Sequence, residues 1–398
     1  MDRPKLRKVD RFEHRREGQD LLVVRDPLGL AEPFALEVEL APVLDLLDGT
    51  RTLPQIRQSL LMGAGLDLPL PDLQDFVAQL REQGLCDDDS FRERWAELHT
   101  DFLEAPQRPP TLAGLVYPAT PHALATELER AIPSVPSRTR PDGTVIGVLA
   151  PHGPIAQVGP LLDETLRGLP APDRLEHIVL LGTDHGPGLL PYAVTAKPYA
   201  TPLGALPPAI DLIDALERRV PWIRREELRH RNAISLELAA VFLLHFYGER
   251  CPPVIPVLCG ATGLMDPEQR DQRERFELAL GGLCEDRPVL WWLSAELSHA
   301  GPAYGRPPLR PTDAMELQAR DAELLAALRT GDDATLAQIT LREHPQGPAS
   351  GGPTLVAAAR MLPAGYRGEL CRQTSVPAPG DEPGVVGMAG MRLHAPAR

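Results

Sequence analysis

The sequence predicts an α/β protein, in which a mostly parallel or mixed sheet is flanked by helices and preceded by a small α+β domain. Four continuous apolar runs are typical of strands that are buried on both faces of such a sheet. Segments with the helical spacing of apolar residues separate these runs, and this alternation is characteristic of α/β proteins. The runs are Val145–Ala150, Ile178–Leu181, Val254–Leu258 and Val289–Leu293.

The composition excludes several classes of protein. With 43% hydrophobic residues, the 398-residue chain can bury a sizeable core. Its formal charge of −14 argues against nucleic acid as a partner, because an acidic surface repels phosphates. No apolar stretch is long enough to predict a membrane-spanning helix. The five cysteines are scattered and form no CxxC pair, which favours reduced thiols and a cytoplasmic location.

The first residues of the chain are rich in positive charge. Seven of the first eighteen residues are Lys or Arg, against four acidic residues. We therefore expect residues 1–20 to form a solvated basic tail.

Residues 21–88 have a pattern of their own. Two short strands are expected at Leu21–Arg25 and Phe34–Leu40. Three helices follow, the first at Ala41–Leu47, the second after an N-cap at Thr52 and the third from about Pro71. This order predicts a winged-helix-like module.

The helical part of this module carries a family resemblance. Its runs LDLLDGTRTLPQI and DLQDFVAQLREQGLCDD resemble PqqD, a small winged-helix domain that holds leader peptides for peptide-modifying enzymes. The resemblance implies that the module binds a peptide as an added strand on its sheet edge. The alternative is a winged helix that only packs on its neighbour.

The rest of the chain is assigned to a helical linker and to one α/β domain. Residues 89–106 have apolar residues at helical spacing, and the turn-forming residues 107–110 mark the boundary. The domain then spans 107–398. Its helices are expected at Ala209–Arg219, Leu236–Phe246, Gln269–Leu280 and Thr312–Arg329.

Histidines follow three of the four apolar runs. His152, His185 and His299 come shortly after the first, second and fourth run. The carboxyl ends of parallel strands share one edge of a sheet, where ligands bind. Three imidazoles at one edge indicate a metal site for iron, copper or zinc. Glu296 lies three residues before His299 and can either complete a two-His, one-carboxylate set or orient an imidazole.

A second resemblance covers nearly all of residues 108–395. Six segments occur in the order of the Memo family and resemble it: RPPTLAGLVYP, APHGPIAQVG, LLGTDHG, ISLELAAVFL, VIPVLCG and LSAELSHAG. Together with the PqqD-like front, they resemble the AmmeMemoRadiSam system protein B group. The resemblance implies a fold related to class III extradiol dioxygenases. It also implies a metal held at His152, at His185 and by a cysteine, with the position of His299 lining the same pocket.

The chain departs from the family pattern at several positions. Ser350 stands where the family has its cysteine, and a serine hydroxyl is a much weaker ligand than a thiolate. The family histidine of E-H-S-I-E is replaced by Ile234, while Ser235 and Glu237 are kept. With Asp184, these two residues are expected to line the pocket.

Two functions of different classes follow. The first is a metal-dependent oxidoreductase, with a divalent metal at His152 and His185, Glu296 or Ser350 as a further ligand, and His299 with Glu296 in catalysis. The second is a non-catalytic Memo scaffold that has lost its metal with the cysteine. Its PqqD-like domain then binds a peptide or recruits a radical-SAM protein.

Overall fold

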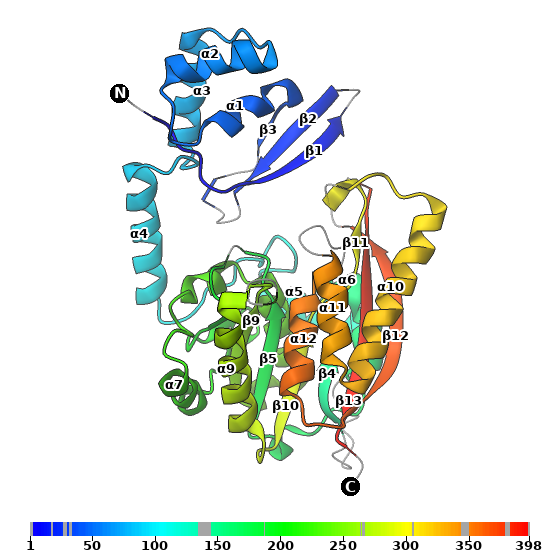
Figure 1. Cartoon of the computed structure of the whole chain (residues 1–398). Helices are drawn as coiled ribbons and strands as arrows, with labels where there is room; N and C mark the ends of the chain where they lie inside the picture. The colour runs from blue at the N-terminus through cyan, green and yellow to red at the C-terminus, as the bar shows by residue number, and fades with distance from the viewer. Residues whose placement is uncertain are drawn as a thin grey trace. The chain divides into compact units, whose positions relative to one another are not determined.

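The computed structural model describes two compact units, which span residues 1–104 and 105–398 (Figure 1). The described residues are 3–16, 19–26, 30–31, 34–133, 145–186, 188–262, 264, 267–304, 306–343, 350–378 and 383–396. Within these ranges, no helix combines the length and the apolar character that a membrane span requires.

The N-terminal unit (residues 1–104) contains a three-stranded antiparallel sheet in the order β1-β2-β3, followed by helices. Leu22 and Val24 of β2 pack with the apolar faces of the helices in one core. Thr52 is the N-cap of α2, as predicted, and its backbone N–H donates to Gln55 Oε1 at 2.9 Å. The elements are β1 (Asp10–Arg16), β2 (Gln19–Arg25), β3 (Phe34–Glu37), η1 (Val38–Leu40), α1 (Ala41–Leu46), α2 (Leu53–Ala64), α3 (Leu70–Glu82) and α4 (Asp89–Glu104).

The structure corrects the expected basic tail at residues 1–20. Asp10–Arg16 form β1, which pairs along its whole length with β2, and Leu6 forms a bridge to Cys86. The tail was expected from charge, but strand pairing satisfies backbone groups and needs few apolar side chains. The predicted strand Phe34–Leu40 is also shorter than expected, because the chain turns into the 3-10 helix η1 after Glu37.

The second unit (residues 105–398) is built on one mixed sheet in the order β11-β13-β4-β10-β5-β9-β6, with β12 paired to β13. Strands β4, β10, β5 and β9 are parallel neighbours and match the four predicted runs. The strands are β4 (Val145–Leu149), β5 (His177–Thr183), β6 (Tyr192–Val194), β9 (Val254–Cys259), β10 (Val289–Ser294), β11 (His299–Ala300), β12 (Arg367–Pro377) and β13 (Val385–His394), besides the separate hairpin of β7 (Tyr199–Thr201) and β8 (Gly204–Leu206).

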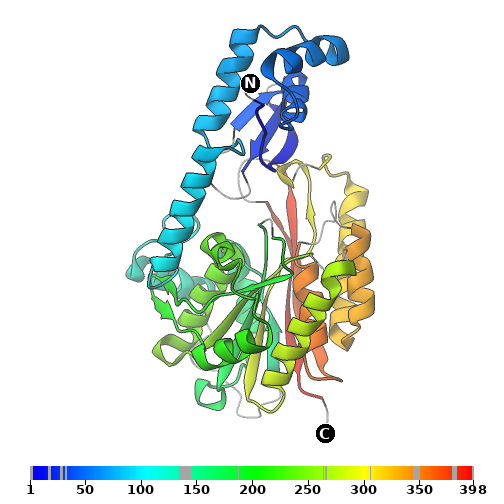
Figure 2. The same cartoon turned by 60° about the vertical axis from the view of Figure 1, so that its left-hand side comes forward.

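Helices cover both faces of this sheet (Figure 2). Neighbouring strand residues point to opposite faces: Val179 belongs to the core under α12, and Leu180 to the core under α8. The helices are α5 (Pro121–Ala131), α6 (Ile155–Thr165), α7 (Ile210–Arg219), α8 (Ile234–Tyr247), α9 (Pro267–Cys284), α10 (Pro311–Thr330), α11 (Asp333–Glu343) and α12 (Gly352–Met361). The 3-10 helices of this unit include η4 (Glu227–Asn232) and η6 (Pro302–Tyr304).

Candidate functional site

Three adjacent parallel strands deliver the candidate residues to one edge of the sheet. β10 lies between β4 and β5, and Leu293 of β10 is in register with both Leu149 and Leu181. The segments after these strands carry His152, Glu296 and His185. These segments therefore leave the sheet at the same carboxyl edge, because of the strand order rather than closeness in sequence.

The imidazoles of His152 and His185 face each other. Their Nε2 atoms are 3.1 Å apart, and the rings meet edge to face. His152 is buried, with 3% of its surface exposed, whereas His185 is exposed to solvent. The pair thus has one side fixed in the protein and one side open to a small ligand.

The polar contacts of His152 favour one tautomer. Its Nδ1 lies 3.4 Å from the Ser294 hydroxyl, which itself donates to the carbonyl of Ser235 at 2.7 Å. The hydroxyl proton is used in that bond, so Nδ1–H of His152 donates to Ser294 Oγ and the lone pair of Nε2 points toward His185. Burial lowers the pKa of His152, and this further favours the neutral ring.

Glu296 and His299 form a second pair beside the two imidazoles. Glu296 Oε2 is 3.0 Å from His299 Nε2 and 3.7 Å from His152 Nε2. Burial raises the pKa of Glu296, but the hydrogen bond and the charge of His299 oppose this effect, and the pKa lies below its ordinary value.

His299 is held from three sides. Its Nδ1–H donates to the carbonyl of Leu297 at 3.1 Å, and its Nε2–H donates to the Glu296 carboxylate. A carbonyl and an ionised carboxylate only accept hydrogen bonds, so both ring nitrogens carry protons in this arrangement. The ring of Tyr304, in η6, meets the His299 ring edge to face at 4.7 Å. Burial, together with the Glu296 charge, raises the pKa of the Tyr304 phenol to about 12.

The fit of a metal ion can be tested on these distances. Two nitrogen ligands at about 2.0–2.1 Å from one ion lie 3.1 Å apart when the angle between them is close to 100°. Ser350, at the start of α12, has a buried Oγ with no hydrogen-bond partner in the described structure. The backbone of Gly351 packs against Glu296, since a Cβ there would lie 2.2 Å from the Glu296 carbonyl oxygen.

The donor set is nevertheless incomplete. Across the described ranges, no three His, Cys, Asp or Glu side chains are grouped as ligands of one ion. His152 and His185 fit an ion as a pair, and Glu296 is occupied by His299. A third protein ligand would have to come from Glu296, whose second carboxylate oxygen does not take part in the bond to His299, or from Ser350.

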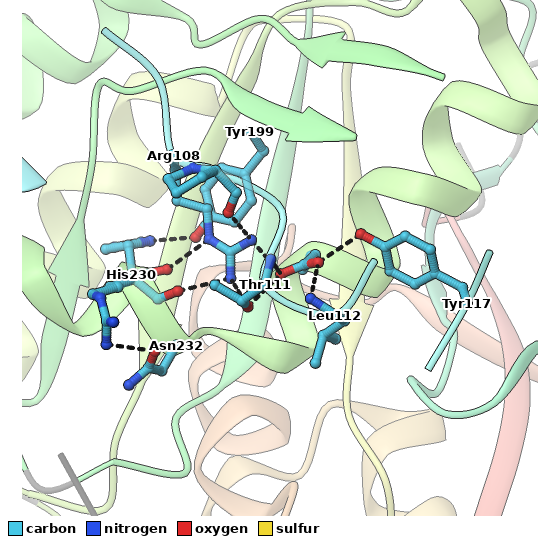
Figure 3. A network of polar contacts seen from close by, with 10 residues as sticks. Arg108, Thr111, Leu112, Tyr117, Tyr199, His230 and Asn232 are labelled. Atoms are coloured by element: carbon cyan, nitrogen blue, oxygen red, sulfur yellow. Dashed lines mark hydrogen bonds and ion pairs between the residues drawn. The ribbon is translucent and has the colours of Figure 1, made fainter. Parts of the chain in front are cut away.

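Two of the predicted pocket residues are bound into the protein. The Ser235 hydroxyl donates to the carbonyl of Thr183 at 2.7 Å. Glu237 is completely buried, and its Oε1 accepts from the Leu112 amide at 2.8 Å and from the Tyr117 hydroxyl at 2.5 Å. Its Oε2 accepts from Arg108 and from Thr111. Glu237 therefore anchors the segment that starts the second unit to α8. Figure 3 shows Arg108, Thr111, Leu112 and Tyr117 of that segment.

The same network contains a histidine that sequence analysis did not single out. His230 is fully buried, its Nδ1 lies 2.6 Å from the Tyr199 hydroxyl, and its carbonyl accepts from Arg108 Nε at 3.0 Å (Figure 3). Burial lowers the pKa of His230 to about 3.

Asp184, the third predicted pocket residue, precedes His185 directly and pairs with Arg229 of η4. The sequence does not single out Arg229, because it is one of several arginines in an arginine-rich stretch. Burial lowers the pKa of the Arg229 guanidinium to about 10. Tyr304 was not predicted either, since no spacing rule connects it to the strands.

Comparison with known proteins finds a family match within the second unit. The family model described as Memo-like protein matches residues 108–351. A MEMO1 family protein of Thermus thermophilus is 30% identical over 283 residues, which are 71% of this chain and 82% of the relative. MEMO1 family proteins of Aquifex aeolicus and Methanopyrus kandleri are 25% and 27% identical, over 72% of this chain in both cases and over 74% and 98% of their own lengths.

Proposed function

The chain belongs to the Memo family, and from this premise we propose that it is a metal-binding oxidoreductase whose ion lies between His152 and His185. The observation that carries the proposal is the 3.1 Å separation of the two Nε2 atoms. Two imidazoles meet in this way either by sharing one proton or by sharing one ion. The side open to solvent leaves coordination positions for a substrate.

The protonation of the site supports metal binding. A histidine binds a metal through a neutral imidazole, and burial keeps His152 in that form. Ser294 orients the ring from its other nitrogen, which is the usual role of a residue behind a metal ligand. The ionised Glu296 adds the negative charge that a cation requires nearby.

His299 and Glu296 are proposed to move the protons of the reaction. The His299 ring carries a proton on Nε2, and the carboxylate that accepts it is 3.0 Å away. His299 donates this proton to a bound substrate only when its hydrogen bond to Glu296 breaks, and the Leu297 carbonyl on Nδ1 then holds the ring in place. Iron or copper, when bound, would supply redox chemistry, and zinc would supply only a Lewis acid.

The metal content of the untagged protein tests the proposal. We expect about one iron, copper or zinc per chain by mass spectrometry, after purification or after anaerobic loading with Fe(II). The double variant His152→Ala/His185→Ala should lose the metal, whereas His122→Ala, which removes an exposed histidine on α5, should keep it. Wild-type protein that stays free of metal under both conditions would refute the proposal.

An oxygen-consumption screen then tests catalysis. His299→Ala should keep its metal but lose about 10²–10⁴-fold in turnover, which is the usual contribution of a general acid. Equal turnover in the wild type and in His299→Ala would show that His299 takes no part in the reaction.

A second candidate function is a scaffold without metal, whose N-terminal unit binds a peptide. Two observations favour it: Ser350 replaces the family cysteine, and β3 has a strand partner on one side only within the described part of the sheet. An extended peptide can add to such an edge through backbone hydrogen bonds. The metal analysis separates the two functions, because only the first predicts a metal that depends on His152 and His185.

A further inference from the structure

The segment that carries His185 is tied to the protein by one buried arginine. Arg229, from η4, pairs with Asp184, the residue directly before His185. Its Nη1 also donates to the Glu226 carboxylate at 2.6 Å and to the Leu190 carbonyl at 3.0 Å. One guanidinium thus contacts the chain on both sides of His185.

The carboxylates extend this connection to the backbone. Asp184 Oδ1 accepts from the Gly186 amide at 2.9 Å, so that its side chain spans His185. Glu226 accepts from the amides of Leu189 and Leu190 at 3.0 and 3.1 Å. Each carboxylate therefore binds Arg229 and, through backbone amides, one side of the segment.

Close packing requires glycine beside the guanidinium. A Cβ at Gly188 would lie 2.3 Å from Arg229 Cζ, and one at Gly260 would lie 3.1 Å from Nη2. The side chains of Arg229 and Asp184 are 9% and 4% exposed. A buried ion pair of this kind is rigid, because its planar donors match the carboxylate geometry and water does not compete.

We propose that Arg229, acting through Asp184 and Glu226, is a positioning residue that holds His185 opposite His152. It also neutralises Asp184, so that this carboxylate is kept out of the ligand set although it adjoins a ligand. The part of the proposal that concerns metal rests on the proposed function. The part that concerns the orientation of His185 does not.

The test compares Arg229→Met with Arg225→Met. Arg225 lies four residues earlier and is exposed, so its removal controls for the loss of one positive charge. Two readouts need no metal: hydrogen exchange of the amides of Gly186, Leu189 and Leu190, and the rate of ethoxycarbonylation of His185. The exposed His122 serves as the internal reference for the second readout.

We expect exchange and modification to be at least about tenfold faster in Arg229→Met and unchanged in Arg225→Met. In the Co(II)-loaded protein, Arg229→Met should bind about 10–100-fold more weakly and show an altered visible absorption band. Arg229→Lys, which keeps the charge but cannot reach both carboxylates, should restore part of this affinity.

Unchanged exchange and modification in Arg229→Met would overturn the proposal. Faster exchange together with an unaltered Co(II) absorption band and an unaltered Co(II) affinity would also overturn it. Arg229 would then stabilise the segment without positioning His185. If the wild-type protein binds no Co(II), the proposed function loses its support, and the modification rate of His185 alone decides the positioning role.

Discussion

At the scale of one residue, substitutions of Ser350 test whether this position can bind the metal ion. The Oγ of Ser350 is buried and has no hydrogen-bond partner among the described residues, and its neighbour Gly351 packs on Glu296. Ser350→Cys places a thiol at this position, and a thiolate is a far stronger ligand than a hydroxyl. We expect at least about a tenfold gain in Zn(II) affinity, measured by competition with a chelator. Ser350→Ala is the control and should leave the affinity as it is in the wild type. An equal affinity of Ser350→Cys and wild type would mean that position 350 does not reach the ion.

His230 predicts a dependence of stability on pH. Burial lowers its pKa to about 3 in the folded protein, against an ordinary value of 6.5. Between these values the unfolded chain binds a proton that the folded protein does not, so stability is complete above pH 6.5 and declines as the pH falls toward 3. The contribution is about 1.4 kcal/mol per pH unit.

Urea unfolding at several pH values between 7 and 4 measures this dependence. His230→Gln should show a shallower loss of unfolding free energy than the wild type over that range. His122→Gln, at an exposed position, is the control. Identical slopes in all three proteins would contradict the prediction.

At the scale of elements, the segment that starts the second unit is attached to α8 by one ion pair. Arg108 and Glu237 are both fully buried, and the carboxylate also accepts from Tyr117 and from the Leu112 amide. Glu237→Gln leaves the buried guanidinium of Arg108 without its charged partner, so we expect a loss of about 3–5 kcal/mol in unfolding free energy. The matched control is Glu176→Gln, which breaks an exposed pair with Arg287 and should cost about 0–1 kcal/mol. Equal losses in the two variants would show that Glu237 is not an anchor.

The elements that sequence analysis predicted are those with a strong local pattern. The apolar runs of β4, β5, β9 and β10 are continuous because both faces of these strands are buried, and this property is visible in sequence. β12 and β13 were not predicted. Their pairing joins residues at the end of the chain to β4, and such contacts leave no local pattern.

The candidate site likewise contains residues that could be predicted from sequence and residues that could not. The strand ends predicted that His152, His185 and His299 would meet, because parallel strands share their carboxyl edge. In the structure His152 contacts His185, and Glu296 Oε2 lies 3.0 Å from His299 Nε2 and 3.7 Å from His152 Nε2. Arg229 and Tyr304 could not be predicted, since each reaches the site from a 3-10 helix whose position depends on tertiary packing. Glu237 was assigned to the pocket because it adjoins Ser235 in a family motif. Its partners, however, come from residues 108–117, more than a hundred positions away.

At the scale of the whole molecule, each unit has its own hydrophobic core. The core of the N-terminal unit contains only residues of that unit, and the two cores of the second unit lie on either side of its sheet. Units with separate cores are expected to unfold in separate transitions. A change that is confined to one core should therefore leave the other transition in place.

A substitution of Asp26 is such a change, because the described contacts of its side chain lie within the N-terminal unit. Asp26 is buried, it pairs with Arg7, and it accepts from the amides of Leu30 and Ala31. Asp26→Asn leaves Arg7 without its charged partner, which costs about 3–5 kcal/mol and lowers the Tm of the first unit by about 12 °C or more. In scanning calorimetry, the transition of the second unit should stay within about 1 °C of its wild-type value, because none of these contacts involves that unit.

The control for this experiment is Asp87→Asn, which breaks an ion pair with Lys5. The Lys5 side chain is 56% exposed, so the loss of this pair should shift neither transition by more than a few degrees. If Asp26→Asn lowers both transitions together, the units do not unfold independently. Metal bound at His152 and His185 should then also stabilise the N-terminal unit. If only the first transition moves, added metal should raise the second transition alone, because a ligand stabilises only the unit that it binds.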